Sequence, residues 1–376
     1  MDLNNTCGTC DMSAINDPSV SSPAVAGAGP DAQGPSQTTP AVDETHLAVD
    51  DETSDEATSE VGGSVASSKT SLADSIYNYR LENGRTYHRY KDGKYFYPND
   101  DRESDRLGQL SRSRHTPSFR TLISSQDLQH YQFLLSLDGK LGLSPPNEND
   151  SQVKRVLDVG TGTGIWAVEF GDLHPQAEVV GVDLSPPQTE VPPNVTFEVD
   201  DVEEPWLFGR PFDYIHSRMM TSSLSNWRQF IQTSFDNLNP GGYLELQEMD
   251  LMPQSDDGTL RPDTAIVKCF ELLGQAAGAL NHPFQDIPAL VKILQEVGFE
   301  DVYIRKVKWP TNTWPKEEHH KTLGTWAHEN CMAGIEGWTI APLTRGLGWR
   351  REEVQVLLIK VREEFRDRSI HAYWPW

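Results

Sequence analysis

The sequence contains no run of about 18 consecutive apolar residues, so it predicts no membrane-spanning helix and no membrane partner. Its first residues, MDLNNTCGTCDM, have neither the basic nor the apolar region of a secretory signal. Four cysteines in 376 residues are too few for a disulfide framework and favour a reducing compartment. Lys/Arg blocks typical of nuclear import signals are missing as well. We therefore expect an intracellular protein, in the nucleus or the cytoplasm, and the sequence does not choose between them.

Positive charge is also scarce, and the formal net charge is −24. An acidic chain repels the phosphate backbone, so we expect no direct binding of nucleic acid. Residues 1–72 combine acidic and small residues with scarcely an aromatic, which predicts a disordered acidic tail. Cys7 and Cys10 form a C-x-x-C motif in this tail. No second Cys/His pair at metal-ligand spacing completes it, so we expect no metal site.

Aromatic residues become dense in YNYRLENGRTYHRYKDGKYFYPND, residues 77–100, where we expect order to begin. This stretch belongs to an N-terminal cap and helical segment, residues 73–150. From about Ser124 the apolar residues of SSQDLQHYQFLLSLDGKLG recur at helical spacing, with Ser125 as a candidate N-cap. The ENGRTYH motif has two open interpretations, a cap over a ligand site or a brace across a sheet. A loop at 144–152 leads into the main domain, residues 151–376.

Apolar strand patterns alternate with helical patterns in the main domain. Strands are expected at residues 155–159, 178–182, 195–199, 212–216 and 243–249, with helices around 163–173 and 227–237. This alternation with short loops predicts a doubly wound α/β sheet. Further along the chain we expect helices at 261–281, 287–298, 316–335 and 351–367, and a strand in DVYIRKVKW.

Three glycines join the first strand to the first helix in RVLDVGTGTGIW, residues 155–166. Gly160, Gly162 and Gly164 can adopt positive φ and, lacking Cβ, let the backbone approach a ligand at a helix N-terminus. A dinucleotide-binding loop reads G-x-G-x-x-G, which would require glycine at Ile165, so a dehydrogenase is disfavoured. Asp158 would oppose a pyrophosphate. It suits a cationic ligand, such as the ammonium group of an amino acid.

Acidic residues also follow the next two strands. Asp183 ends the second strand, where a carboxylate can accept both hydroxyls of a ribose. The third strand ends at Asp200, Asp201 and Val202, where an acid can accept an exocyclic amine of adenine. Because adjacent residues point to opposite faces of a strand, only one of the two acids is expected to do so, and we choose Asp201.

This combination resembles class I S-adenosylmethionine-dependent methyltransferases. More narrowly, ENGRTYH, YPND, LDVGTGTGIWA, GVDLSP, FDYIHSR, NPGGYLELQE and IHAY resemble the LaeA-like methyltransferases of filamentous fungi, from about Tyr77 to the C-terminus. The resemblance implies a seven-strand Rossmann-like sheet and S-adenosylmethionine as methyl donor. It also implies which residues hold the donor: Asp158, Gly160, Gly162 and Gly164 the methionine part, Asp183 the ribose, and Asp201 and Val202 the adenine.

The same resemblance implies a role in fungal secondary metabolism, either as a biosynthetic enzyme or as a regulator. The methyl acceptor would be a small molecule or a protein, and velvet-domain regulators are candidate partners. The alternative is a catalytically silent protein that keeps the fold as a scaffold for regulatory partners.

Several residues are candidates for the acceptor side, each with a structural alternative. His216, at the end of the fourth strand, is either a general base or acceptor-orienting group, or a structural histidine. Arg218 could bind an acidic acceptor or form a surface ion pair. On the fifth strand, one of Glu245, Gln247 and Glu248 could face the pocket. The late tryptophans, which either form core or line an acceptor cavity, are Trp309, Trp314, Trp326, Trp338 and Trp349.

Three further expectations concern the last third of the chain. Cys269 and Cys331 should be buried apolar residues, and His319 and His320 an exposed pair. In the family resembled, IHAY opens an antiparallel seventh strand that inserts between the fifth and the sixth. Here the sequence reads IHAYWPW, with Pro375 unable to donate to a ladder. We therefore expect an incomplete interior strand and lower stability than in a relative with a longer strand.

Overall fold

The computed structural model describes residues 42–43, 79–88, 94–100, 128–187 and 190–376. The predicted tail lies outside these ranges apart from β1 (Val42–Asp43), which pairs in parallel with β9 (Ile304–Arg305). The C-x-x-C motif and the candidate cap Ser125 also lie outside the described residues. Among the described helices, none combines the length and the apolar character needed to cross a membrane.

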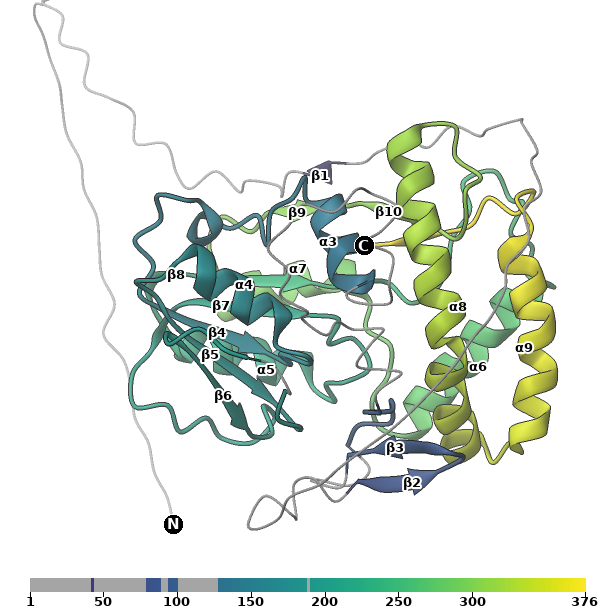
Figure 1. The fold of residues 1–376 in the computed structure, drawn as a ribbon, viewed down its shortest axis with the longest axis horizontal. Helices are drawn as coiled ribbons and strands as arrows, with labels where there is room; N and C mark the ends of the chain where they lie inside the picture. The colour runs from purple at the N-terminus through teal and green to yellow at the C-terminus, as the bar shows by residue number, and fades with distance from the viewer. Residues whose placement is uncertain (1–41, 44–78, 89–93, 101–127, 188–189) are drawn as a thin grey trace, which may run out of the picture. The chain divides into compact units, whose positions relative to one another are not determined.

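Five strands form the central sheet, in the order β6-β5-β4-β7-β8 (Figure 1). All neighbouring strands run in parallel. The first strand in sequence is central, the next two lie on one side of it and the last two on the other. This confirms the doubly wound α/β sheet, and in such sheets ligands bind where the strand order reverses, here between β4 and β7. The strands are β4 (Arg155–Val159), β5 (Glu178–Asp183), β6 (Val195–Val199), β7 (Phe212–Arg218) and β8 (Leu238–Gln247).

Helices cover both faces of this sheet because successive strand residues are buried on opposite sides. Val156 and Val179 pack against the helix that follows the glycine loop. Leu157 and Val180 pack on the other face, against two later helices. Fully burying such a side chain contributes about 1.5–3 kcal/mol. The covering helices are α4 (Ile165–Leu173) on the first face, with α5 (Trp227–Asp236) and α7 (Ile287–Val297) on the second.

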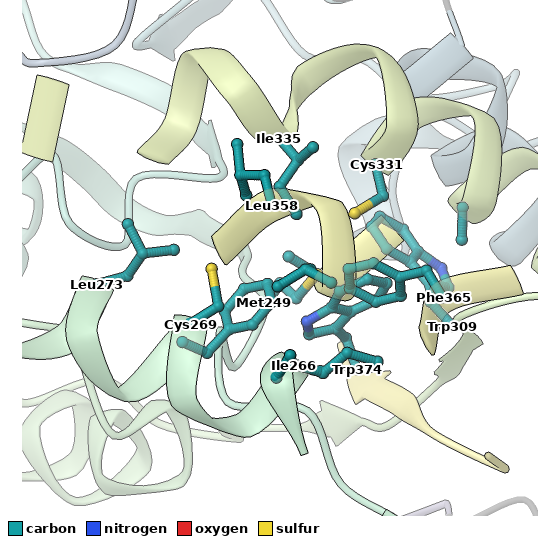
Figure 2. Packing of buried hydrophobic residues seen from close by; sticks show 14 of the residues in the cluster. Met249, Ile266, Cys269, Leu273, Trp309, Cys331, Ile335, Leu358, Phe365 and Trp374 are labelled. Carbon is teal, nitrogen blue, oxygen red and sulfur yellow. The ribbon is translucent and has the colours of Figure 1, made fainter. Parts of the chain in front are cut away.

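A further group of helices encloses a large apolar cluster of its own (Figures 1 and 2). Within it Trp309 and Trp374 lie near Phe365 and the two cysteines. Cys269 and Cys331 are buried, as predicted, and burial raises the pKa of Cys269 to about 12. The group consists of α3 (Leu128–Ser136), α6 (Ala265–Ala279), α8 (Glu318–Leu347) and α9 (Arg351–Arg366), with the short helix η1 (Pro145–Asn147) following α3 in sequence.

Helix α8 differs from its prediction in two ways. It continues past Pro342 to Leu347 and ends at Gly348, which has the positive φ of a helix C-terminus. Its buried residues follow one stripe as far as Ile335, but from Gly337 to Leu343 they lie on more than one side, so apolar spacing could not reveal that the helix continues. The pair of histidines was predicted as exposed, but only His319 is exposed. His320 is buried and its Nδ1 lies 2.6 Å from a carboxylate oxygen of Glu317.

The ENGRTYH motif forms a hairpin of β2 (Arg80–Glu82) and β3 (Arg85–Tyr87). Asn83 and Gly84 turn it with φ of 53° and 78°, the conformation that Asn-Gly favours in two-residue hairpin loops. The hairpin is tied to α8, because Nη2 of Arg345 donates to Oε2 of Glu82 at 2.8 Å. Figure 1 shows it beside one end of this helix.

The C-terminal residues form a separate antiparallel pair, β10 (Lys308–Pro310) with β11 (Tyr373–Pro375). The seven-strand count is therefore not confirmed, since the parallel sheet has five strands. Pro375 interrupts nothing on the β10 side, because Trp376 and Val307 exchange both hydrogen bonds there. The proline nitrogen lies at the alternate position and faces residues 250–254, where the Pro375 carbonyl accepts the N–H of Asp250 at 2.9 Å. The chain end thus lies antiparallel between β10 and the segment that follows β8.

Candidate active site

The glycine loop adopts the conformation that its sequence requires. Gly160, Gly162 and Gly164 have φ of 67°, 57° and 81°. A Cβ at Gly162 would enter open space, whereas one at Gly160 would collide with Sδ of Met220. A Cβ at Gly164 would lie 2.5 Å from the ring of Phe197. Gly160 and Gly162 line the main pocket, and Gly164 serves close packing behind the loop.

Asp158 lies beneath this loop and does not line the pocket. Its carboxylate is 3% exposed and accepts two hydrogen bonds, from Oγ1 of Thr161 at 2.6 Å and from Nδ1 of His216 at 2.7 Å. Asp158 therefore stabilises the glycine loop from below, through its hydrogen bond to Thr161. Through Thr161, which does line the pocket, its charge helps to fix the loop backbone.

His216 is fully buried and does not line the pocket either. Its ring stacks on Trp166 with 3.7 Å between centroids and 5° between planes. A general base must reach the proton that it removes. The position of His216 therefore favours a structural role, in which its ring orients Asp158.

Asp183 ends β5 and lines the pocket, as its predicted role requires. Its Oδ2 accepts the N–H of Gly162 at 2.9 Å, and its Oδ1 accepts the N–H of Ser185 at 3.2 Å. An ionised carboxylate has about four acceptor positions, so both oxygens keep capacity for ligand hydroxyls. Asp183 thus couples the glycine loop to the next strand end.

The end of β6 brings Asp200, Asp201 and Val202 to the same pocket. Asp201 is 4% exposed, and its Oδ1 accepts the N–H of Glu203 at 3.0 Å. Its Oδ2 lies 2.5 Å from Nζ of Lys94. Asp200 is exposed but lines the same pocket, so the expectation that only one of the two acids faces the site is not confirmed.

The pocket has a volume of about 430 Å³, and one of its walls comes from the N-terminal segment. We name this the N-terminal wall, residues 79–88 and 94–100. His88 lies here, and burial lowers its pKa although the charge of Asp183 raises it. Sequence reasoning raised a cap as one interpretation of ENGRTYH but did not identify single residues. The members that line the pocket are Tyr79, Thr86, His88, Lys94, Tyr95, Pro98, Asn99 and Asp100.

On the acceptor side only Arg218 of the predicted candidates lines the pocket. Its guanidinium lies over the Phe133 ring and donates to Nδ1 of the buried His130 at 3.2 Å. Burial, together with the charge of Arg218, lowers the pKa of His130, although a hydrogen bond to Glu169 raises it. None of the five late tryptophans lines the pocket, and Trp309 and Trp314 are core residues.

The three polar residues of the fifth strand brace other segments and do not line the pocket. Glu245 accepts the N–H groups of Leu143 and Ser144, both at 2.9 Å. Gln247 donates to the Leu141 carbonyl at 2.8 Å. Glu248, directly after β8, accepts hydrogen bonds from the N–H groups of Met220 and Thr221, in the loop that follows β7.

The pocket is acidic. Its lining includes one lysine, Lys94, and one arginine, Arg218. These are outnumbered by the carboxylates of Asp100, Asp183, Asp200, Asp201 and Glu203. In the described part of the chain, no group of three or more His, Cys, Asp or Glu side chains is arranged to hold a metal.

Comparison with known proteins shows to which family the chain belongs. A family model described as a methyltransferase domain matches residues 128–304. The methyltransferase pytC of Aspergillus terreus is 40% identical over 312 residues, which cover 82% of this chain and 90% of that protein. The chain belongs to the LaeA-like fungal methyltransferases.

Two further members of this family are similar to the chain. The secondary metabolism regulator LAE1 of Cochliobolus heterostrophus is 36% identical over 301 residues, covering 79% of this chain and 92% of the relative. The protein-methionine methyltransferase laeA of Emericella nidulans is 33% identical over 299 residues, covering 78% and 74%. A match that covers 82% of the chain is longer than residues 128–376, so it must begin before residue 128. The likeness to other LaeA-like proteins therefore includes the N-terminal wall.

Proposed function

We propose that this LaeA-like protein is an S-adenosylmethionine-dependent methyltransferase that acts in fungal secondary metabolism. The observation that carries the proposal is the convergence of three strand ends on one pocket. The glycine loop after β4, Asp183 after β5 and Asp201 with Val202 after β6 all line it. Relatives named as methyltransferases and as secondary metabolism regulators support the biological setting.

The residues present fit S-adenosylmethionine. Gly162 leaves room for the methionine part, because the space at its Cβ position is open and a ligand can approach the backbone there. Asp183 has acceptor capacity for the ribose hydroxyls, and Asp201 and Val202 lie at the next strand end for the adenine. An excess of carboxylates over cations suits a ligand that carries both an ammonium and a sulfonium group.

When bound, S-adenosylmethionine supplies an activated methyl group on a positively charged sulfur, which can be displaced without a metal. The chain then has to orient the donor and acceptor and keep water out. The loop, Asp183 and Asp201 provide the orientation. The N-terminal wall lines the same pocket.

The methyl acceptor is a small molecule or a protein that enters near Arg218 and Gln129, which line the same pocket. Velvet-domain regulators are candidate partners of a regulatory form of this activity. Mixing purified protein with a purified velvet-domain protein and measuring co-elution tests that part. Separate elution would favour the biosynthetic role.

Isothermal titration of the full chain with S-adenosylmethionine tests the proposal directly. We expect saturable binding, and we expect its loss in Gly162→Val, where a side chain would occupy the open space. Gly258→Val is the matched control, because Gly258 also has positive φ and open surroundings but does not line the pocket. If the folded wild-type chain binds no donor, the protein is better explained as a silent scaffold.

A further inference from the structure

The N-terminal wall contacts all three strand-end loops that surround the pocket beyond the glycine loop. Nδ1 of His88 lies 2.6 Å from Oγ of Ser185, after β5. Nζ of Lys94 lies 2.5 Å from Oδ2 of Asp201, after β6. Oη of Tyr97 lies 2.9 Å from Oγ of Ser222, after β7. One short stretch of chain thus fastens to three successive loops by side-chain contacts.

The wall is also held from behind, so these contacts start from a fixed base. The backbone N–H of Asn99 donates to the Thr86 carbonyl at 2.9 Å. Nη2 of Arg85 donates to Oδ1 of Asp100 at 2.7 Å, and both side chains are largely buried. Phe96 is 2% exposed and its ring meets His282 edge-on. Together with the bond between Arg345 and Glu82, these contacts connect the wall to α8.

Lys94 occupies a special place among these contacts, because its partner is the acid at the adenine end of the pocket. The Asp201 side chain is 4% exposed and that of Lys94 is 36% exposed. A buried carboxylate needs hydrogen-bonding or ionic partners, because removing it from water is costly. Asp201 obtains one from the Glu203 N–H and the other from Lys94. A second carboxylate, Glu203, lies 3.6 Å from the same Nζ.

The Glu203 N–H binds Oδ1 and the Lys94 ammonium group forms its ion pair with Oδ2, so contacts to both oxygens restrict rotation of the carboxylate. Every carboxylate oxygen keeps a further acceptor position after one bond. Contacts to both oxygens leave the carboxylate little rotation and so determine where those acceptor positions point. Asp201 and Lys94 both line the pocket, while the Asp201 oxygen that contacts Lys94, Oδ2, is itself buried.

We propose that Lys94 is a positioning residue that orients Asp201 toward the adenine amine of the methyl donor and makes the N-terminal wall part of the donor site. This inference rests on the proposed function. It assigns adenine recognition to a residue far from the glycine loop in sequence.

Binding of S-adenosylhomocysteine to the full chain, measured by isothermal titration, tests the proposal. We expect Lys94→Met to raise Kd about tenfold or more, which corresponds to about 1.4 kcal/mol. Lys94→Arg keeps the charge and should restore most of the affinity. Lys140→Met is the control, because Lys140 forms an exposed ion pair with Glu148 at 3.0 Å and does not line the pocket.

Two readouts separate positioning from a merely structural effect. Lys94→Met should cause no further loss in an Asp201→Asn background, because the lysine acts through that carboxylate. The wild type should also prefer S-adenosylhomocysteine to its inosine analogue, which lacks the exocyclic amine, and Lys94→Met should lose this preference. Lys94→Gln repeats the test if the Met variant fails to fold.

The outcomes are distinguishable. If the wild type binds and Lys94→Met binds equally well with the same base preference, the inference is overturned while the proposed function stands. If the folded wild type binds neither S-adenosylmethionine nor S-adenosylhomocysteine, the proposed function fails and the inference fails with it.

Discussion

His216 lies directly beneath the glycine loop and binds Asp158, with 2.7 Å between Nδ1 and Oδ1. Its Nε2 has no hydrogen-bond partner within the described residues, so the proton belongs on Nδ1, where it is donated to the carboxylate. Thr161 supplies the second bond to Asp158 from inside the loop. His216, for which the sequence left a base or a structural role open, is thus connected to the pocket through Asp158 and Thr161.

Replacing His216 by Leu should lower the free energy of unfolding by about 3 kcal/mol, because it removes one partner of a buried carboxylate. Donor affinity should fall as well, since Asp158 supports the loop. Denaturant unfolding and isothermal titration measure the two effects, with His319→Leu, on the exposed surface, expected to stay within about 0.5 kcal/mol. Loss of turnover with unchanged stability and unchanged donor affinity would instead favour a base.

The glycines of the loop should separate into two kinds of variant. Gly162→Ala should cost only about 1–2 kcal/mol of stability, the penalty of a left-handed conformation, but should weaken donor binding. Gly164→Ala adds a collision with Phe197 and should cost about 2–4 kcal/mol. Gly258 also has positive φ but lies near neither Phe197 nor the pocket. Gly258→Ala should therefore lose as much stability as Gly162→Ala without weakening donor binding. Equal stability of the two loop variants would contradict this assignment.

The features that could be predicted from the sequence are those encoded locally. Apolar strand patterns gave the five parallel strands, and the spacing from Asp158 to Gly164 predicted a ligand loop at the first strand end. Lys94 and Asp201 escaped prediction as a pair because no periodicity relates residues so far apart. The side to which Pro375 turns its nitrogen could not be predicted for a related reason. Whether its nitrogen faces a ladder partner depends on register, which is set by the tertiary pairing of β10 with β11.

Glu248 should make stability depend on pH. Burial raises its pKa to about 8 from an ordinary value of 4.5, although the N–H groups of Met220 and Thr221, each at 2.9 Å, lower it. Between these two values the folded protein holds a proton that the unfolded chain releases. The contribution of this group therefore falls as pH rises from about 4.5 to about 8.

The measurement is the free energy of unfolding at about pH 7 and about pH 8.5, above the range in which exposed histidines titrate. The wild type should lose stability over this interval, and Glu248→Gln should lose less. The variant should be less stable at both values, because its NH₂ group replaces one of the two oxygens and cannot accept the backbone N–H that this oxygen binds. Parallel pH profiles for the two proteins would contradict the assignment.

The C-terminal strand should matter for stability as much as a core helix does. Trp374 in β11 is 4% exposed, and its ring centroid lies 5.5 Å from that of Phe365 in α9 and 5.9 Å from that of Phe270 in α6. Trp374→Ala removes these contacts and should cost about 3–5 kcal/mol in denaturant unfolding. Val356→Ala, on the exposed side of α9, should change stability by less than about 0.5 kcal/mol. A loss at Trp374 no larger than that control would mean that the pairing of β10 with β11 does not hold the helical cluster together.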